Sequence, residues 1–371
     1  MEYIEIVYQI RTPEEEVSAF AESVMVEQSI ETPLTVAQRY PFVREHMLGQ
    51  IRSLTPDGEG GYRAVIALPT ITASVDAAQF LNVLYGNASL HEEVVFLDFE
   101  LPASVRDRFS GPRFGIEGLR RLTGAYDRPL TCTALKPVGL TVTELADLCR
   151  RFAEGGIDFI KDDHYLGDHP FCPFEERVRA CQQAVNDVAE RTGHRAVYVP
   201  NLSGTPDEVF RQAAFAQNEG VGAVMAAPML LGLPFFYQLV RDHLDVPVLA
   251  HPSFAGATRI AERTLLGKIF RLYGADAVIF ANYGGRFSSS QETCAGIATT
   301  LRAEWGAVRP AMPVPAGGMS AQRSAELTAF FGIDTMLLVG GSLLEAGEAL
   351  TERTRDFMLS VEQAALEQAK A

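Results

Sequence analysis

Two patterns of hydrophobic and polar positions follow one another along the chain, and the first ends near residue 126. Within it, runs that alternate apolar and polar residues predict half-buried strands, at Tyr3–Ile10, Tyr62–Leu68 and Val94–Glu100. Thr12-Pro13-Glu14-Glu15 opens a predicted helix, with proline in the first turn and acids near the positive end, and Ser74–Tyr85 is a second predicted helix. Gly-Ala-Tyr-Asp-Arg-Pro at 124–129 forms a boundary loop. Residues 1–126 are therefore expected to form an N-terminal α+β domain.

From Leu130 onward, short apolar runs alternate with segments of helical periodicity. The expected inner strands are Thr131–Leu135, Asp158–Asp162, Ala196–Val199, Gly222–Ala226, Val248–His251, Ala277–Ala281, Pro313–Pro315 and Thr335–Val339. Helical patterns between them include Val142–Ala153, Pro206–Asn218, Phe236–His243 and Ala321–Phe331. Eight strand–helix repeats predict a (β/α)₈ TIM barrel over residues 127–371. A doubly wound open sheet is the alternative, but nothing like GxGxxG follows the first of these strands.

Composition narrows the class of protein. The chain has 371 residues, 47% of them hydrophobic and 21% charged, which is ordinary for a soluble two-domain enzyme. A formal charge of −15 argues against nucleic-acid binding, because no basic stripe could offset it. The cysteines are scattered without CxxC spacing, and the N-terminus lacks the basic-then-apolar order of a signal peptide. These features predict reduced thiols and a cytoplasmic protein.

One uncharged apolar run, Val221–Tyr237, has to be weighed as a membrane segment. Pro228, Gly232 and Pro234 interrupt it, and the run is short for a span. A buried strand, a loop and the start of a helix explain it better, so no membrane association is expected.

Four ionisable residues follow the second predicted barrel strand, at Lys161-Asp162-Asp163-His164. Barrel enzymes carry their chemistry at this end of the strands. An ammonium group cannot bind a metal, but a neutral lysine amine that takes up CO₂ becomes a carbamate with two oxygens. With Asp163 and His164 it would form an oxygen-rich site suited to Mg²⁺. The alternative is a solvated charge cluster at a strand end.

These residues carry a family resemblance. The string GGIDFIKDDH at 155–164, preceded by Leu135-Lys136-Pro137 and Gly139-Leu140, resembles the large subunit of RuBisCO and, more closely, the RuBisCO-like proteins. The resemblance extends over nearly the whole chain. It implies a ferredoxin-like N-terminal domain, a barrel, and Mg²⁺ held by a carbamate on Lys161 together with Asp163. His164 stands where the family has a glutamate.

Further strand ends add candidates that each have an ordinary structural alternative. Lys136 is either a base or a surface lysine, and the resemblance implies the base. His251 is either a base or a core histidine. Asn201 either orders the metal site or caps the helix near Pro206. Arg286 either contacts substrate or lies on the surface.

Paired glycines after the last two barrel strands predict a phosphate site. Their backbone N–H groups can approach an anion closely, although either pair alone could be a tight turn. Both pairs match the family's first phosphate site: Gly317, Gly318, Gly340 and Gly341.

Departures from RuBisCO limit the reaction. Val138 stands where the carboxylase has a second lysine, Pro252 replaces the arginine that binds the second phosphate, and the mobile-loop lysine is missing. What remains suits Mg-assisted enolisation of a sugar monophosphate, not CO₂ fixation. The segment EQSIETP at 27–33 resembles the branch that isomerises 5-methylthioribulose 1-phosphate. The alternatives are a decarboxylase of a 3-oxo sugar-acid phosphate, a methionine-salvage enolase, and a non-catalytic binding or regulatory barrel.

Two residues of the N-terminal domain, Glu27 and Asn87, match family positions that complete the active site of a partner subunit. The resemblance therefore implies a homodimer with shared active sites.

Overall fold

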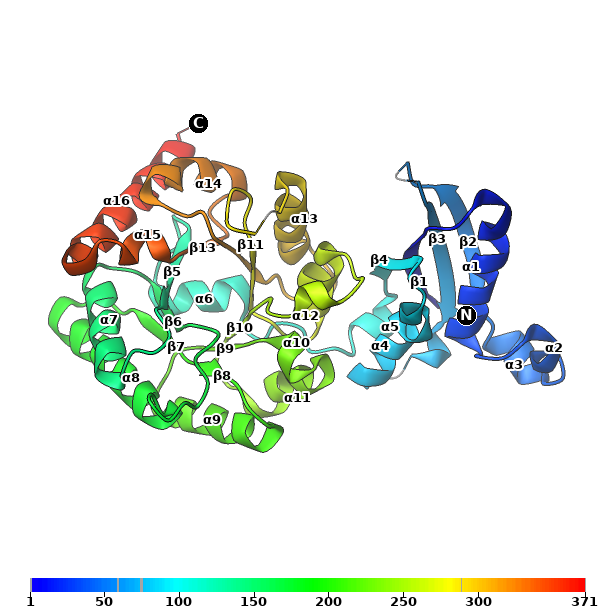
Figure 1. Cartoon of the computed structure of the whole chain (residues 1–371), viewed down its shortest axis with the longest axis horizontal. Coiled ribbons are helices and arrows are strands. Elements are labelled where there is room, and N and C mark those ends of the chain that lie inside the picture. Colours follow the sequence, from blue (N-terminus) through cyan, green and yellow to red (C-terminus); the bar gives the residue numbers. More distant parts are fainter. Residues whose placement is uncertain (1, 59, 74–75, 288, 371) are drawn as a thin grey trace. The chain divides into compact units, whose positions relative to one another are not determined.

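The structure, a computed structural model, describes residues 2–58, 60–73, 76–287 and 289–370 as two compact units (Figure 1). The smaller comprises Met1–Ser110, Ala255–Leu265 and Gly306–Val308, and the larger comprises the remainder. Residues 111–126 thus lie with the larger unit, while the boundary expected at 126 stays a prediction. No helix of the described residues is long and apolar enough to cross a membrane.

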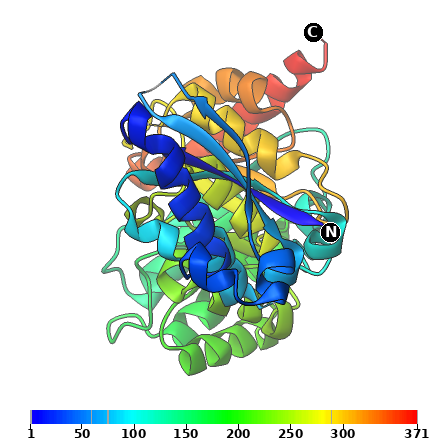
Figure 2. The same ribbon diagram turned by 90° about the vertical axis from the view of Figure 1, so that its right-hand side faces the viewer.

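The smaller unit is built on a four-stranded antiparallel sheet of order β2-β3-β1-β4. Helix α1 packs against β2 and β3 and lies over the sheet in Figure 2. The elements are β1 (Tyr3–Ile10), α1 (Glu14–Ser29), α2 (Leu34–Ala37), α3 (Pro41–His46), β2 (Gln50–Pro56), β3 (Tyr62–Pro69), α4 (Ala77–Tyr85), β4 (Val94–Glu100) and α5 (Ala103–Arg106). The helix expected at Ser74–Tyr85 begins at Ala77, where Asp76 caps the amides of Ala78 and Gln79, and residues 74–75 lie outside the described chain.

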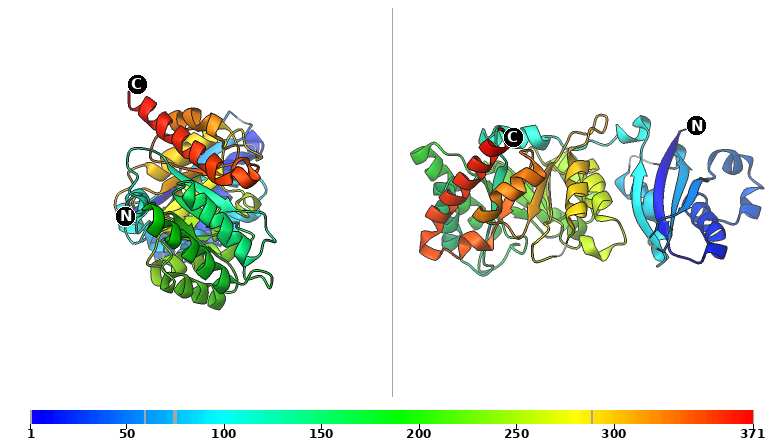
Figure 3. Two further views of the ribbon diagram at one scale, coloured as in Figure 1. Left: turned by 90° about the vertical axis from the view of Figure 1, so that its left-hand side faces the viewer. Right: turned by 90° about the horizontal axis from the view of Figure 1, so that it is seen from above.

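The larger unit alternates strands and helices in the predicted order. It contains α6 (Gly115–Thr123), β5 (Leu130–Leu135), α7 (Val142–Glu154), β6 (Phe159–Asp162), α8 (Phe174–Thr192), β7 (Val197–Val199), β8 (Asn201–Leu202), α9 (Pro206–Asn218), β9 (Val224–Ala226), α10 (Pro228–Leu231), α11 (Leu233–His243), β10 (Val248–Ala250), α12 (Phe270–Leu272), β11 (Ala277–Ala281), α13 (Gln291–Arg302), β12 (Met312–Ala316), α14 (Ser324–Phe331), β13 (Met336–Val339), α15 (Gly341–Leu344) and α16 (Leu350–Gln368). Helices surround the strands, and α14 (orange) packs beside α16 (red) in Figure 3.

The parallel sheet of this unit closes on itself. Its order is β7-β6-β5-β13-β12-β11-β10-β9-β8, so the two outer positions belong to one stretch of chain, residues 197–202. Pro200, which has no N–H to donate, divides that stretch into β7 and β8. β7 pairs with β6 through Val199 and Lys161, and β8 pairs with β9 through Asn201 and Met225. The predicted barrel fold is confirmed.

Alternate residues of each strand point into the barrel. The interior is filled by side chains from every strand but the short β8, and they include Leu130, Cys132, Phe159, Val197, Val199, Met225, Leu249, Ile279, Val314 and Leu338. If every second residue continues to point inward toward the carboxyl ends of the strands, five polar residues lie on the same inner face: Lys136, Lys161, Asp163, Asn201 and His251. Asp162, one residue out of phase, belongs to the outer face.

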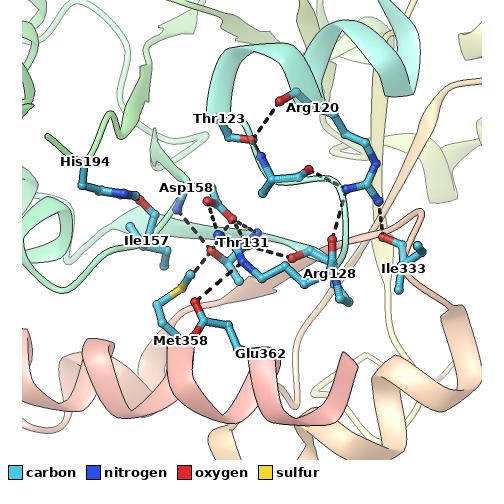
Figure 4. A network of polar contacts seen from close by, with 12 residues as sticks. Arg120, Thr123, Arg128, Thr131, Ile157, Asp158, His194, Ile333, Met358 and Glu362 are labelled. Carbon is cyan, nitrogen blue, oxygen red and sulfur yellow. Dashed lines mark hydrogen bonds and ion pairs between the residues drawn. The ribbon is translucent and has the colours of Figure 1, made fainter. Parts of the chain in front are cut away.

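A buried polar network ties the amino-terminal ends of β5 and β6 together (Figure 4). Both Asp158 carboxylate oxygens accept hydrogen bonds from Arg128, at 2.7 and 2.9 Å. Asp158 also accepts from the amide and hydroxyl of Thr131, at 2.8 and 2.9 Å. The site-bearing strands are thus held at the end opposite to the candidate active site.

Candidate active site

The two residues of opposite charge at the ends of β5 and β6 form an ion pair. Lys136 Nζ contacts Asp163 Oδ2, and the lysine side chain is 43% exposed while the aspartate side chain is 1% exposed. Burial raises the pKa of the Asp163 carboxyl, but the contact with Lys136 and the Tyr165 amide outweigh it and bring that pKa below its usual range. Asp163 is therefore an ionised carboxylate that faces an accessible lysine.

Lys161 lies deeper on the same inner face and is 2% exposed. Its Nζ donates to the carbonyl of Asp162 at 2.8 Å. Burial lowers the pKa of the Lys161 amine, and Lys136 adds to this, although Cys132 and Asp163 act in the opposite direction. A larger neutral fraction follows, and only the neutral amine can react with CO₂.

Two imidazoles stack beside this group. The rings of His164 and His251 lie 4.1 Å apart at 14°. Burial lowers the pKa of both, and for His251, helped by the charges of Lys161, His164 and Lys136, the value falls to about 2. His251 Nδ1 accepts the Ser253 amide at 3.2 Å, so the ring hydrogen lies on Nε2. A neutral ring with this tautomer suits hydrogen-bond donation from Nε2–H better than the role of base.

The chemistry of the donors fits a metal only if the lysine is modified. The described residues contain no group of three or more His, Cys, Asp or Glu side chains that could hold a metal ion. Asp163 supplies one anionic ligand, and His164, at 3.6 Å from Asp163 Oδ1, supplies a neutral imidazole. A carbamate on Lys161 would supply the third, and the lowered pKa of its buried amine is consistent with that.

Asn201 and Arg286 also reach this region. Asn201 Nδ2 donates to the carbonyls of His164 and Leu166, at 3.2 and 3.1 Å. It does not cap α9, whose first turn is capped by Thr205 and Glu208. The Arg286 guanidinium stacks over Phe287 at 4.9 Å, and its charge contributes to the lowered pKa of His164. Asn201 therefore contacts the loop that carries His164.

The glycine loops after β12 and β13 lie next to each other. Ser342 Oγ donates to the Met319 carbonyl at 2.8 Å, which bridges the two loops. Gly317 and Gly318 have φ of 97° and 65°, a region that favours glycine. A Cβ at Gly318 would lie 2.6 Å from the carbonyl oxygen of Gly284, whereas one at Gly340 or Gly341 would meet no atom within 4 Å. Gly340 and Gly341 thus face open space, as a phosphate site requires, whereas Gly318 packs closely against the Gly284 carbonyl.

Glu27 and Asn87 are brought together within the smaller unit. Asn87 Nδ2 donates to Glu27 Oε1 at 2.6 Å, and Gln28 accepts the amide of Ala88 at 2.9 Å. The two residues therefore form one polar patch at the end of α1.

Sequence reasoning missed three residues that act on this site. Ser253 sets the tautomer of His251, and Arg177 and Tyr198 bind Asp162. The sequence offered one clue to Arg177: Asp162 is out of phase with the inward-facing residues of β6, so its side chain must point outward, toward α8.

Comparison with known proteins agrees with this geometry. Residues 115–347 match the catalytic domain of the ribulose bisphosphate carboxylase large chain. A 5-methylthioribulose-1-phosphate isomerase from Rhodospirillum rubrum is 44% identical over 359 residues, 96% of each chain. A 2,3-diketo-5-methylthiopentyl-1-phosphate enolase from Geobacillus thermodenitrificans is 36% identical over 75% of this chain and 69% of its own length.

A crystal structure is also similar. That of a RuBisCO-like protein from Rhodopseudomonas palustris superimposes with a TM-score of 0.90 at 40% identity, covering 98% of both chains. The chain therefore belongs to the RuBisCO large-chain family, among the RuBisCO-like proteins.

Proposed function

We propose that the chain is an isomerase that enolises a phosphorylated ketopentose such as 5-methylthioribulose 1-phosphate, and that it does not fix CO₂. The observation that carries this is the Lys136–Asp163 ion pair beside buried Lys161, with the N–H of His251 at the same barrel end. One accessible amine and one imidazole donor suit the transfer of a proton between carbons next to a carbonyl. The named activity of the isomerase relative supports the same class of reaction.

Lys136 is proposed as the base. Its Nζ contacts Asp163 in the structure, and it would be free to face a substrate carbon once Asp163 binds a metal ion. Mg²⁺ bound by Asp163, His164 and a carbamate on Lys161 would polarise the substrate carbonyl and stabilise an enediolate. His251 Nε2–H would donate a hydrogen bond to a substrate oxygen, and the proton that moves between carbons would be carried by Lys136.

The substrate carries a single phosphate in this proposal. Gly317, Gly318, Gly340 and Gly341 offer backbone N–H groups for it. No guanidinium follows His251 to bind a second phosphate, because Pro252 occupies that position. This favours a ketopentose monophosphate over a bisphosphate.

The test is proton NMR in D₂O with 5-methylthioribulose 1-phosphate, Mg²⁺ and bicarbonate. We expect solvent deuterium in the substrate and formation of 1-methylthioxylulose 5-phosphate. Lys136→Ala combined with His251→Ala should abolish the exchange. Exchange that survives in the double variant would discard both assigned roles.

Two alternatives remain within enzymes, and a third is non-catalytic. The enolase relative favours a 2,3-diketo-5-methylthiopentyl 1-phosphate substrate, which gives enolisation without isomerisation. A decarboxylase would release CO₂ from a 3-oxo sugar-acid phosphate. A binding or regulatory barrel would show no turnover that depends on Mg²⁺ and bicarbonate.

A further inference from the structure

Asp162 lies in the charged run at the end of β6 but serves a different purpose from Asp163. Its carboxylate is fully buried and accepts three hydrogen bonds on the outer face of the barrel. The donors are Arg177 Nε at 3.0 Å, the Tyr198 hydroxyl at 2.8 Å and the Asn201 amide at 3.1 Å. Such a carboxylate anchors its neighbours and has no contact with a substrate.

Two of those donors also bind the loop that follows β6. Arg177 Nη1 donates to the carbonyls of Gly167 and Cys172, at 3.1 and 3.0 Å. Asn201 Nδ2 donates hydrogen bonds to the carbonyls of His164 and Leu166. Four carbonyls of the loop 163–172 thus accept from the side chains of Arg177 and Asn201, and both residues also donate to Asp162, Arg177 through its guanidinium and Asn201 through its backbone amide.

This loop has no helix or strand to satisfy its backbone, yet it begins with Asp163 and His164. Arg177 is 0% exposed, so its guanidinium is committed to Asp162, the loop and the ring of Phe174, which it overlies at 5.5 Å. The arginine guanidinium is a rigid, planar group with five N–H donors. It can therefore bind a carboxylate and two carbonyls at once, which the ammonium group of a lysine cannot do in the same geometry.

We propose that Arg177 is a positioning residue that, through Asp162 and the loop carbonyls, holds Asp163 and His164 in their working orientation. The kinetic part of the test rests on the proposed function, whereas the part that measures backbone order does not. Supporting groups of this kind change activity without touching the substrate.

The test compares Arg177→Met with Arg120→Met. Arg120 is the matched control, because it too is buried, pairs with a carboxylate (Asp334, 2.8 Å), and donates to backbone carbonyls, here three (Ala125, Arg128 and Ile333, at 2.7, 3.1 and 2.6 Å). It lies at the amino-terminal end of the barrel strands (Figure 4), whereas the loop 163–172 follows the carboxyl end of β6.

Arg177→Met should lower kcat by about 10- to 100-fold with KM nearly unchanged. Amide hydrogen exchange at Tyr165 and Leu166, which are bonded to Asp163, should rise by at least about tenfold. Arg177→Lys should recover part of both. In Arg120→Met, kcat and loop exchange per folded molecule should stay near wild type.

Wild-type kcat and loop exchange in Arg177→Met would overturn the proposal, as would equal effects in Arg120→Met. If Arg177→Met does not fold, Tyr198→Phe replaces it, since the change removes one hydrogen bond to Asp162 and keeps the ring. Its loop exchange must then rise and its kcat fall, and unchanged values overturn the proposal. Faster exchange in a chain that proves to lack isomerase activity would leave the positioning role standing while removing the proposed function.

Discussion

Lys161 is the residue on which the proposed chemistry most depends, and its burial explains why. A lysine in water is almost entirely protonated at neutral pH, and an ammonium does not react with CO₂. The inner face of the barrel lowers the pKa of the Lys161 amine, while ionised Asp163 remains close enough to interact with it. Burial thus favours the reactive neutral amine, and a carbamate would add a negative charge beside Asp163.

Lys161→Met should therefore remove the carbamate and the activity together. With ¹³C-labelled bicarbonate and Mg²⁺, we expect a carbamate carbon signal in the wild type and none in the variant. Deuterium exchange into substrate should fall by at least about a hundredfold. Lys268→Met is the control, because Lys268 is another buried lysine of the barrel unit and should leave the signal intact. A signal that persists in Lys161→Met would place the modification elsewhere.

Asp158 illustrates a buried charge whose value lies in stability. It is paired with Arg128 and Thr131, so removing the carboxylate leaves the half-buried guanidinium of Arg128 without its main partner. Asp158→Ala should lower the free energy of unfolding by about 3–5 kcal/mol, measured by urea denaturation. Asp187→Ala, at an exposed aspartate of α8, should change it by less than about 0.5 kcal/mol. Similar losses in both variants would contradict this account.

Among the elements, strands with a regular pattern could be predicted and those without one could not. β1 and β4 occupy their expected residues, because each alternates or is buried along its length. β2 was missed, since all but one of its residues are exposed and no alternation marks it. The third barrel strand was expected to end at Val199, as β7 does, but the two-residue β8 that follows Pro200 was not predicted, because it is too short to show a pattern.

The candidate site was predictable as a set of strand ends but not as contacts. Successive side chains of a strand point to opposite faces, so Asp162 and Asp163 could be assigned to different faces of β6 from the sequence alone. The partners Arg177, Tyr198 and Ser253 depend on how α8, β7 and the loop after β10 pack, which no local pattern encodes. The roles of the catalytic and phosphate-binding residues stay predictions.

The loop after β12 provides a test at the scale of the element. Gly318→Ala combines a φ of 65° with a Cβ 2.6 Å from the Gly284 carbonyl, so the loop must shift. Binding of inorganic phosphate, measured by calorimetry, should weaken by at least about tenfold. Gly332→Ala, also at positive φ but with a Cβ 3.8 Å from its nearest neighbour Arg302, is the control for backbone strain alone. Equal phosphate affinity in both variants would remove the phosphate role from this loop.

At the scale of the whole molecule, the Glu27–Asn87 pair bears on assembly. Its hydrogen bond joins α1 to the segment after α4, and no local function for it is evident within the smaller unit. The family resemblance implies that the pair completes the site of a second subunit. In a symmetric dimer with shared sites, each active site requires residues from both chains.

Intersubunit complementation tests directly whether each active site needs residues from both chains. Glu27→Gln and Lys161→Met should each give an inactive homodimer, but a heterodimer isolated with two affinity tags contains one site with both native groups. It should recover about half of the wild-type activity, because the other site lacks both. A heterodimer of Lys161→Met with Asp163→Asn must stay inactive, since both changes lie on the same barrel end and spoil both sites. Should the first heterodimer be as inactive as its parents, Glu27 does not act across an interface; and if no heterodimer can be isolated, the shared-site arrangement itself fails.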